Sequence, residues 1–84
     1  MTAATSPDEL RAQIVDILRR TVPGAEVEGL DPQADLRDQL DMDSLDVLNF
    51  ATALSHELDV PVAESDYPEL MTLERCTAYV LSSR

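Results

Sequence analysis

The sequence predicts an all-α fold, a small four-helix bundle of three longer helices and one short helix, with a long ordered loop between helices 1 and 2. In three stretches, apolar residues recur at intervals of three and four, the spacing of one buried helix face. Each stretch begins beside a residue that can cap a helix. The chain has 84 residues, 44% of them apolar, which suffices for one core and leaves no room for a second.

The first helix is expected to begin after Ser6. Ser6 can serve as the cap, Pro7 suits the first turn, and Glu9 is placed to complete a capping box. Its apolar stripe comprises Leu10, Ile14, Ile17 and Leu18. The helix should end at Val22-Pro23-Gly24. Because its apolar stripe must be buried, its main contribution is to the core.

A connection of about twenty residues follows, from Pro23 to Met42, which is longer than connections within small domains usually are. Its proline and glycine residues break any long helix. Its apolar residues are spaced to hold it on the core, and they are Val27, Leu30, Leu36 and Leu40. We therefore expect an ordered loop with a short helical turn at residues 35–39.

The second long helix has the clearest pattern in the chain. Asp43 is a good cap for it, and Ser44 falls in its first turn with the hydroxyl group facing water. Its buried face is predicted to comprise Val47, Phe50, Ala51, Leu54 and Leu58. Leu45 and Leu48 lie off this face. Together with Met42 they are expected to expose three apolar side chains around the Ser44 hydroxyl, a candidate docking patch.

Two further helices complete the predicted bundle. The residue before Pro61 disfavours helical geometry, and residues 65–70 can then form one short helix capped by Ser65 or Asp66. Thr72 is a candidate cap for the last helix. That helix should return Leu73, Cys76 and Val80 to the core, with Cys76 as a buried structural residue.

The charge of the chain restricts its partners. Six Lys and Arg residues stand against 17 Asp and Glu residues, a formal net charge of −11. Such a chain repels nucleic acid and anionic membranes and attracts basic protein surfaces. There is neither a signal-peptide pattern at the N-terminus nor an apolar run long enough to insert in a membrane. We therefore expect a cytoplasmic monomer.

Ser44 is not predicted to be a catalytic nucleophile. A serine needs a nearby base, and the only histidine, His56, lies about 18 Å further along the same helix at 1.5 Å per residue. No Gly-x-Ser-x-Gly motif is present. We therefore do not expect a serine hydrolase.

The acidic cluster after Leu40 does not predict a metal site. A calcium loop beginning at Asp41 would need an Asp or Asn, a Gly and a Glu where the chain has Leu45, Asp46 and Thr52. We therefore expect no specific metal site in this chain.

A family resemblance rests on Asp43-Ser44-Leu45, with Leu40 four residues before the serine and a helix behind it. This segment resembles the modification site of acyl carrier proteins. The similarity runs from about Leu10 to Leu81 and is strongest over residues 35–45, 58–61 and 72–80. One departure is Asp41, where the family usually has glycine.

The resemblance implies that Ser44 is esterified with 4′-phosphopantetheine from coenzyme A, whose thiol carries acyl groups as thioesters. It also implies a non-catalytic carrier, which performs no chemistry of its own. The acyl carrier domain would then span residues 6–82, with a frayed N-terminus at 1–5 and a C-terminal tail at 83–84. The start of the second long helix suits the phosphodiester, although Asp43 and Asp46 oppose its charge.

The resemblance also implies roles for two groups of residues. A phosphopantetheinyl transferase and acyl-loading or acyl-using enzymes with basic docking patches would recognise Met42, Asp43, Leu45, Asp46, Leu48 and Asn49. The residues that could line a cavity for the acyl chain are Leu36, Leu40, Phe50, Leu54, Val62 and Leu70.

The kind of carrier stays open at this point. Aspartate before the serine resembles fatty-acid and polyketide carriers, but Asn49, Ser55 and His56 stand where fatty-acid carriers tend to have acidic contacts. A specialised, freestanding carrier of a secondary or lipid pathway is one interpretation, and an aminoacyl carrier loaded by a dedicated ligase is another. The alternative from a different class is an unmodified acidic helical adaptor that binds a basic partner.

Overall fold

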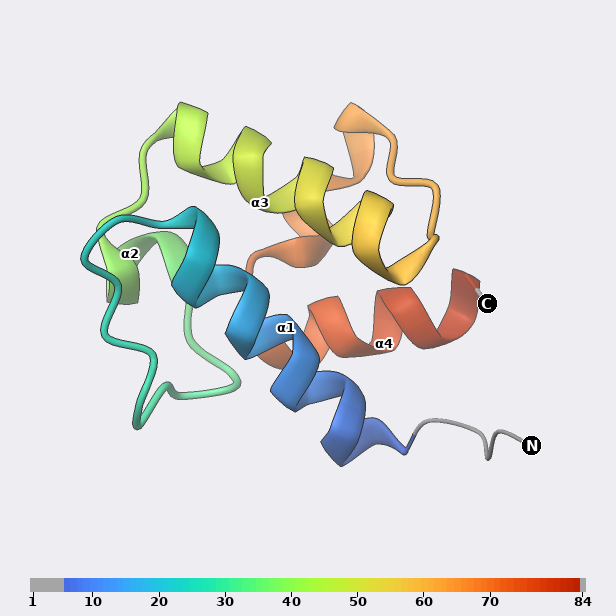
Figure 1. The fold of residues 1–84 in the computed structure, drawn as a ribbon, viewed down its shortest axis with the longest axis horizontal. Helices are drawn as coiled ribbons and strands as arrows, with labels where there is room; N and C mark the ends of the chain where they lie inside the picture. The colour runs from blue at the N-terminus through green and yellow to red at the C-terminus, as the bar shows by residue number, and fades with distance from the viewer. Residues whose placement is uncertain (1–5, 84) are drawn as a thin grey trace.

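A computed structural model describes residues 6–83 as an assembly of helices (Figure 1). Three are long: α1 at Pro7–Thr21, α3 at Ser44–Leu58 and α4 at Leu73–Ser83. The short α2 at Leu36–Leu40 precedes α3, and the 3-10 helix η1 at Glu64–Leu70 precedes α4. This confirms the predicted helical bundle, while the expected frayed residues 1–5 lie outside the described part of the chain.

The cap residues explain where the long helices begin. The Ser6 hydroxyl accepts the N–H of Glu9 at 3.1 Å, and the Glu9 carboxylate completes the expected capping box. Thr72 Oγ1 accepts the N–H of Arg75 at 3.0 Å and so caps α4 as expected. Ser83, which the sequence places in a C-terminal tail, is the last residue of α4.

The expected cap of the short helix before α4 is wrong. η1 begins one residue earlier than predicted, its N-cap is Ala63, and no side chain caps it. Pro68 lies inside η1 and has no N–H to donate, so it removes one bond of the helix, as is tolerated in a short 3-10 segment. Instead, the Tyr79 hydroxyl of α4 donates to the Asp66 carboxylate at 2.8 Å, a bond that links η1 to α4.

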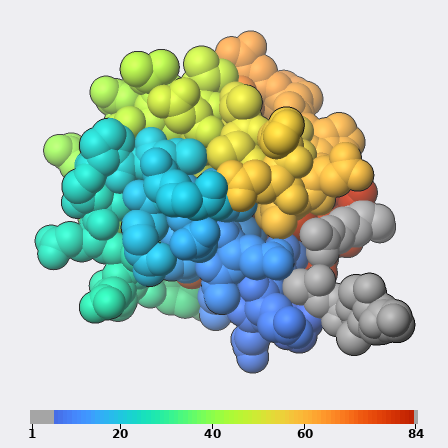
Figure 2. Space-filling view, in the orientation of Figure 1, coloured from blue at the N-terminus to red at the C-terminus, as the bar shows by residue number. Residues whose placement is uncertain are grey.

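The core lies between α1, α3 and α4, and the predicted apolar stripes of all three helices are buried in it. Figure 2 shows one face of the molecule, on which α1 and the loop after it lie beside α3. The loop is ordered, as expected, with Val27 buried and Leu30 packed against the core. Two backbone bonds tie this connection to the junction of η1 and α4, from Leu36 N–H to the Met71 carbonyl (2.7 Å) and from Glu74 N–H to the Pro32 carbonyl (2.9 Å).

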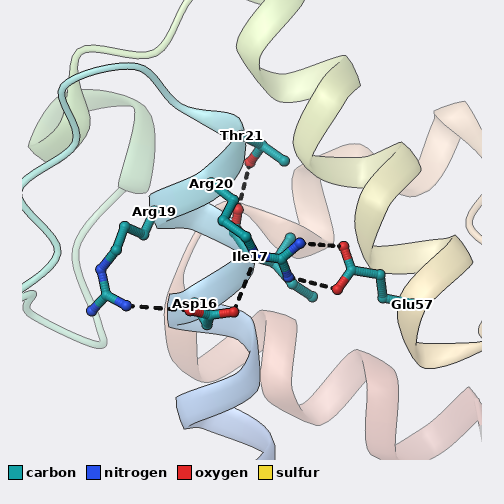
Figure 3. Close-up of polar contacts among 6 residues, drawn as sticks. All are labelled: Asp16, Ile17, Arg19, Arg20, Thr21 and Glu57. Carbon is teal, nitrogen blue, oxygen red and sulfur yellow. Dashed lines mark hydrogen bonds and ion pairs between the residues drawn. The ribbon is translucent and has the colours of Figure 1, made fainter.

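An ion-pair cluster joins the C-terminal ends of α1 and α3 (Figure 3). The Arg20 guanidinium donates to both carboxylate oxygens of Glu57, at 2.6 and 2.9 Å, and its Nε donates to Asp16 at 3.1 Å. Hydrogen bonding from Arg20 lowers the pKa of Glu57, and burial opposes this only in part. Because Glu57 is in the last turn of α3 and Ser44 is its first residue, the cluster lies at the end of α3 remote from Ser44.

Candidate functional site

Ser44 is the first residue of α3 and is exposed. The cap of the helix is made by its neighbours, because Asp43 Oδ1 accepts the N–H of Asp46 at 2.9 Å and Asp46 Oδ2 accepts the N–H of Asp43 at 3.2 Å. This reciprocal capping box confirms Asp43 as the cap and adds Asp46 to it. The helix start is thus formed without the Ser44 hydroxyl, which is presented to solvent.

Asp41 sets the direction of the chain into α3. It is the C-cap of α2 and has a left-handed backbone with φ of 53°. The Met42 N–H then donates to the Arg37 carbonyl at 3.1 Å, so the connection between the two helices is tight. Asp41 therefore adopts a conformation that favours glycine, at the position where the resemblance suggests glycine.

The predicted patch of three exposed apolar side chains contains only two. Leu45 and Leu48 are 61% and 44% exposed, as expected, but Met42 is only 8% exposed and belongs to the core. Met42 was predicted to be exposed because it precedes the helix. The turn at Asp41 instead places Met42 among the buried residues at this end of the core, which also include Leu40 and Val47.

A groove of about 810 Å³ opens beside Ser44. It lies between residues of α2, the start of α3, η1 and the start of α4. Its apolar wall consists of Met42, Val47, Leu48, Tyr67, Pro68 and Met71, and its polar rim of Asp35, Arg37, Asp43, Ser44, Glu64, Thr72 and Arg75. The groove has the size and mixed lining of many small-molecule sites.

The residues predicted to line an acyl cavity do not line this groove. Leu36, Phe50, Leu54 and Leu70 are fully buried in the core, Leu40 is 8% exposed, and Val62 packs against the core from a smaller pocket near His56. Sequence reasoning missed the groove because its wall combines residues of α3 with residues that flank η1. The one sequence feature that could have pointed to the groove is Met71, an apolar residue directly after the predicted short helix.

The remaining candidate groups lie elsewhere. His56 is in the last turn of α3, whereas Ser44 is in the first. Cys76 is buried as expected, and burial raises the pKa of its thiol to about 12, so the thiol is protonated at neutral pH.

The described residues contain neither a candidate metal cluster nor a helix that could cross a membrane. Within residues 6–83, no group of three or more His, Cys, Asp or Glu side chains is placed to hold a metal ion. None of the helices in this range has both the length and the apolar character needed to cross a membrane.

Comparisons with known proteins relate the chain to acyl carrier proteins. The chain is 29% identical over 75 residues to a protein named acyl carrier protein from Syntrophobacter fumaroxidans, which covers 89% of this chain and 91% of that protein. A solved structure of the acyl carrier protein from Enterococcus faecalis superposes with a TM-score of 0.77 at 20% identity. That match covers 94% of this chain and 99% of the other and shows a shared fold.

The decisive match is to a family of attachment domains. Residues 8–80 match the family model described as the phosphopantetheine attachment site. This range contains every helix of the fold apart from the ends of α1 and α4. The prosthetic group of this family is covalently attached 4′-phosphopantetheine, and an exposed serine hydroxyl at a helix start is a group to which it can be esterified. The chain belongs to the phosphopantetheine attachment family, as its resemblance to acyl carrier proteins suggested.

Proposed function

We propose that this chain is a freestanding acyl carrier protein in which Ser44 is esterified with 4′-phosphopantetheine. When attached, the group supplies a thiol that holds acyl intermediates as thioesters. The protein presents these intermediates to partner enzymes of fatty-acid, polyketide or related secondary and lipid biosynthesis. The observation that carries the proposal is the exposed Ser44 hydroxyl at the first position of α3, beside a groove and free of the capping role that Asp43 performs.

The chain itself supplies attachment and recognition in this proposal, and no catalysis. The only histidine, His56, belongs to the opposite end of α3 and cannot act as a base for Ser44. The transferase must therefore bring the base that activates the serine. The proposed setting is the cytoplasm, with the carrier acting as a monomer.

Recognition is proposed to rest on the exposed surface around Ser44. Leu45 and Leu48 offer apolar contacts, and Asp43, Asp46 and Asn49 offer polar ones. The net charge of −11 favours partners with basic docking patches. Raising the salt concentration should weaken these encounters because it screens exposed charges.

The test is the intact mass of the purified protein after incubation with coenzyme A and a broad-specificity phosphopantetheinyl transferase. The wild type should gain the mass of one phosphopantetheine, and Ser44→Ala should gain none. Ser65→Ala removes an exposed serine of η1 and serves as the matched control, which should be modified like the wild type. Absence of any gain in folded wild type with more than one transferase would instead favour the unmodified adaptor.

Loading assays address the cargo. If the modified protein accepts an amino acid from a ligase and no acyl group from acyl-loading enzymes, the aminoacyl carrier is the correct alternative. Transfer of an acyl group to the thiol supports the acyl carrier.

A further inference from the structure

The surroundings of Ser44 are unfavourable to a new negative charge. Asp41, Asp43 and Asp46 lie within three residues of it. A helix start ordinarily stabilises an anion, but here the N–H of Asp46 already donates to the Asp43 carboxylate. A phosphodiester on Ser44 would therefore need a counter-charge from another part of the molecule.

Such counter-charges are few in this chain and unevenly placed. All six basic residues are arginines. Arg19 and Arg20 are on α1, where Arg19 pairs with Asp16 of the same helix. Arg20 pairs with Glu57 in the last turn of α3, at the end remote from Ser44. Arg37 of α2 and Arg75 of α4, by contrast, both line the groove that Ser44 borders.

The backbone of Arg37 is held close to the turn that leads to Ser44, and its side chain is only loosely paired. Its carbonyl accepts the N–H of Met42, two residues before Ser44. Its side chain is 56% exposed and contacts Asp35 through one nitrogen at 3.5 Å. A tight charge-assisted bond is closer to 2.8 Å, about the length of the Arg20–Glu57 bonds, so the guanidinium of Arg37 has donors left for another anion.

Arg75 adds a second guanidinium at the same groove. It belongs to the first turn of α4, is 54% exposed and pairs with Glu69 through one nitrogen at 3.1 Å. The groove that these arginines and Ser44 line also has an apolar wall, which offers a surface for the pantetheine chain, and about 810 Å³ is ample for it.

We propose that Arg37, assisted by Arg75, binds the phosphodiester of the group attached to Ser44 and thereby lays the pantetheine chain along this groove. The inference rests on the proposed function, since it requires the group on Ser44. It assigns to two arginines a positioning role toward the prosthetic group, and it makes Asp35 a competitor for the Arg37 guanidinium.

The test is ³¹P NMR of the modified protein, with the urea-unfolded modified protein as the reference for a free phosphodiester. The wild-type phosphorus shift should differ from the reference. Arg37→Gln should move it most of the way to the reference, and Arg75→Gln part of the way. Salt at about 1 M, where the Debye length is about 3 Å, should move the wild type in the same direction.

Two further variants make the test specific. Asp35→Asn keeps a good cap on α2 and removes the competing charge, so it should move the phosphorus shift further from the reference. Arg19→Gln removes an exposed charge of α1 away from the groove and should leave the shift unchanged.

The inference is overturned if Arg37→Gln and Arg75→Gln, each folded and modified, give the wild-type phosphorus shift. Failure of the proposed function is a separate result, because it shows as the absence of modification in the mass measurement. The readout is spectroscopic and does not depend on any activity of the loaded carrier.

Discussion

Asp41 turns the chain from α2 into α3 with a left-handed backbone, φ 53°. A residue other than glycine pays about 1–2 kcal/mol for this conformation, less for aspartate than for most. Asp59 has the same geometry at the end of α3, with φ 54°. Both positions show that the fold imposes the conformation on the residue.

Replacing Asp41 by glycine should stabilise the protein. We expect Asp41→Gly to raise the free energy of unfolding by about 0.5–1 kcal/mol, because the relief of strain exceeds the extra chain entropy of glycine. Chemical denaturation measures this. Asp41→Asn removes the charge while tolerating the left-handed region, so it separates the effect of charge from that of the backbone. A loss of stability in Asp41→Gly would contradict the account.

Asp43 combines a structural role with a proposed recognition role, and two substitutions separate them. Asp43→Asn retains a good cap and should leave stability nearly unchanged, whereas Asp43→Ala should lower it by about 1 kcal/mol. Both remove the charge, so the transferase should modify both variants more slowly and by a similar factor. If the transferase modifies Asp43→Asn at the wild-type rate, the Asp43 carboxylate charge has no role in recognition and the residue acts only as a helix cap.

At the scale of elements, the Arg20–Glu57 pair joins α1 to α3. Because Arg20 lowers the pKa of Glu57 below its ordinary value of 4.5, the pair contributes stability above that pH and loses it as the pH falls through the lowered value. The wild type should therefore exceed Glu57→Gln in unfolding midpoint at neutral pH, and the difference should vanish in acid. Arg20→Gln should show the same trend. A difference that does not depend on pH would exclude this origin.

The short helix η1 depends on a contact from α4 because no side chain caps it. The Tyr79 hydroxyl donates to Asp66, and this bond, with burial, raises the pKa of Tyr79. Tyr79→Phe should speed amide hydrogen exchange in η1 while exchange in α1 stays unchanged. Equal protection of η1 in the variant and the wild type would show that packing alone holds it.

At the scale of the whole molecule, local signals predicted the helices well. The caps Ser6, Asp43 and Thr72 act over three residues, and such short-range chemistry is visible in sequence. The groove was not predictable in this way. Arg37 and Arg75 line it from elements that are far apart in the chain. The burial of Met42 follows from the turn at Asp41, which the residue type of Met42 does not specify.

The exposed position of Ser44 at the start of α3 supports the central claim, that this serine is the attachment point. The most direct measurement is the mass of the tryptic peptide of residues 38–75 after treatment with coenzyme A and a transferase, fragmented to locate the added group. The account predicts phosphopantetheine on Ser44 and none on Ser55 or Ser65. An unmodified peptide from fully folded protein, or a group on either other serine, would contradict it.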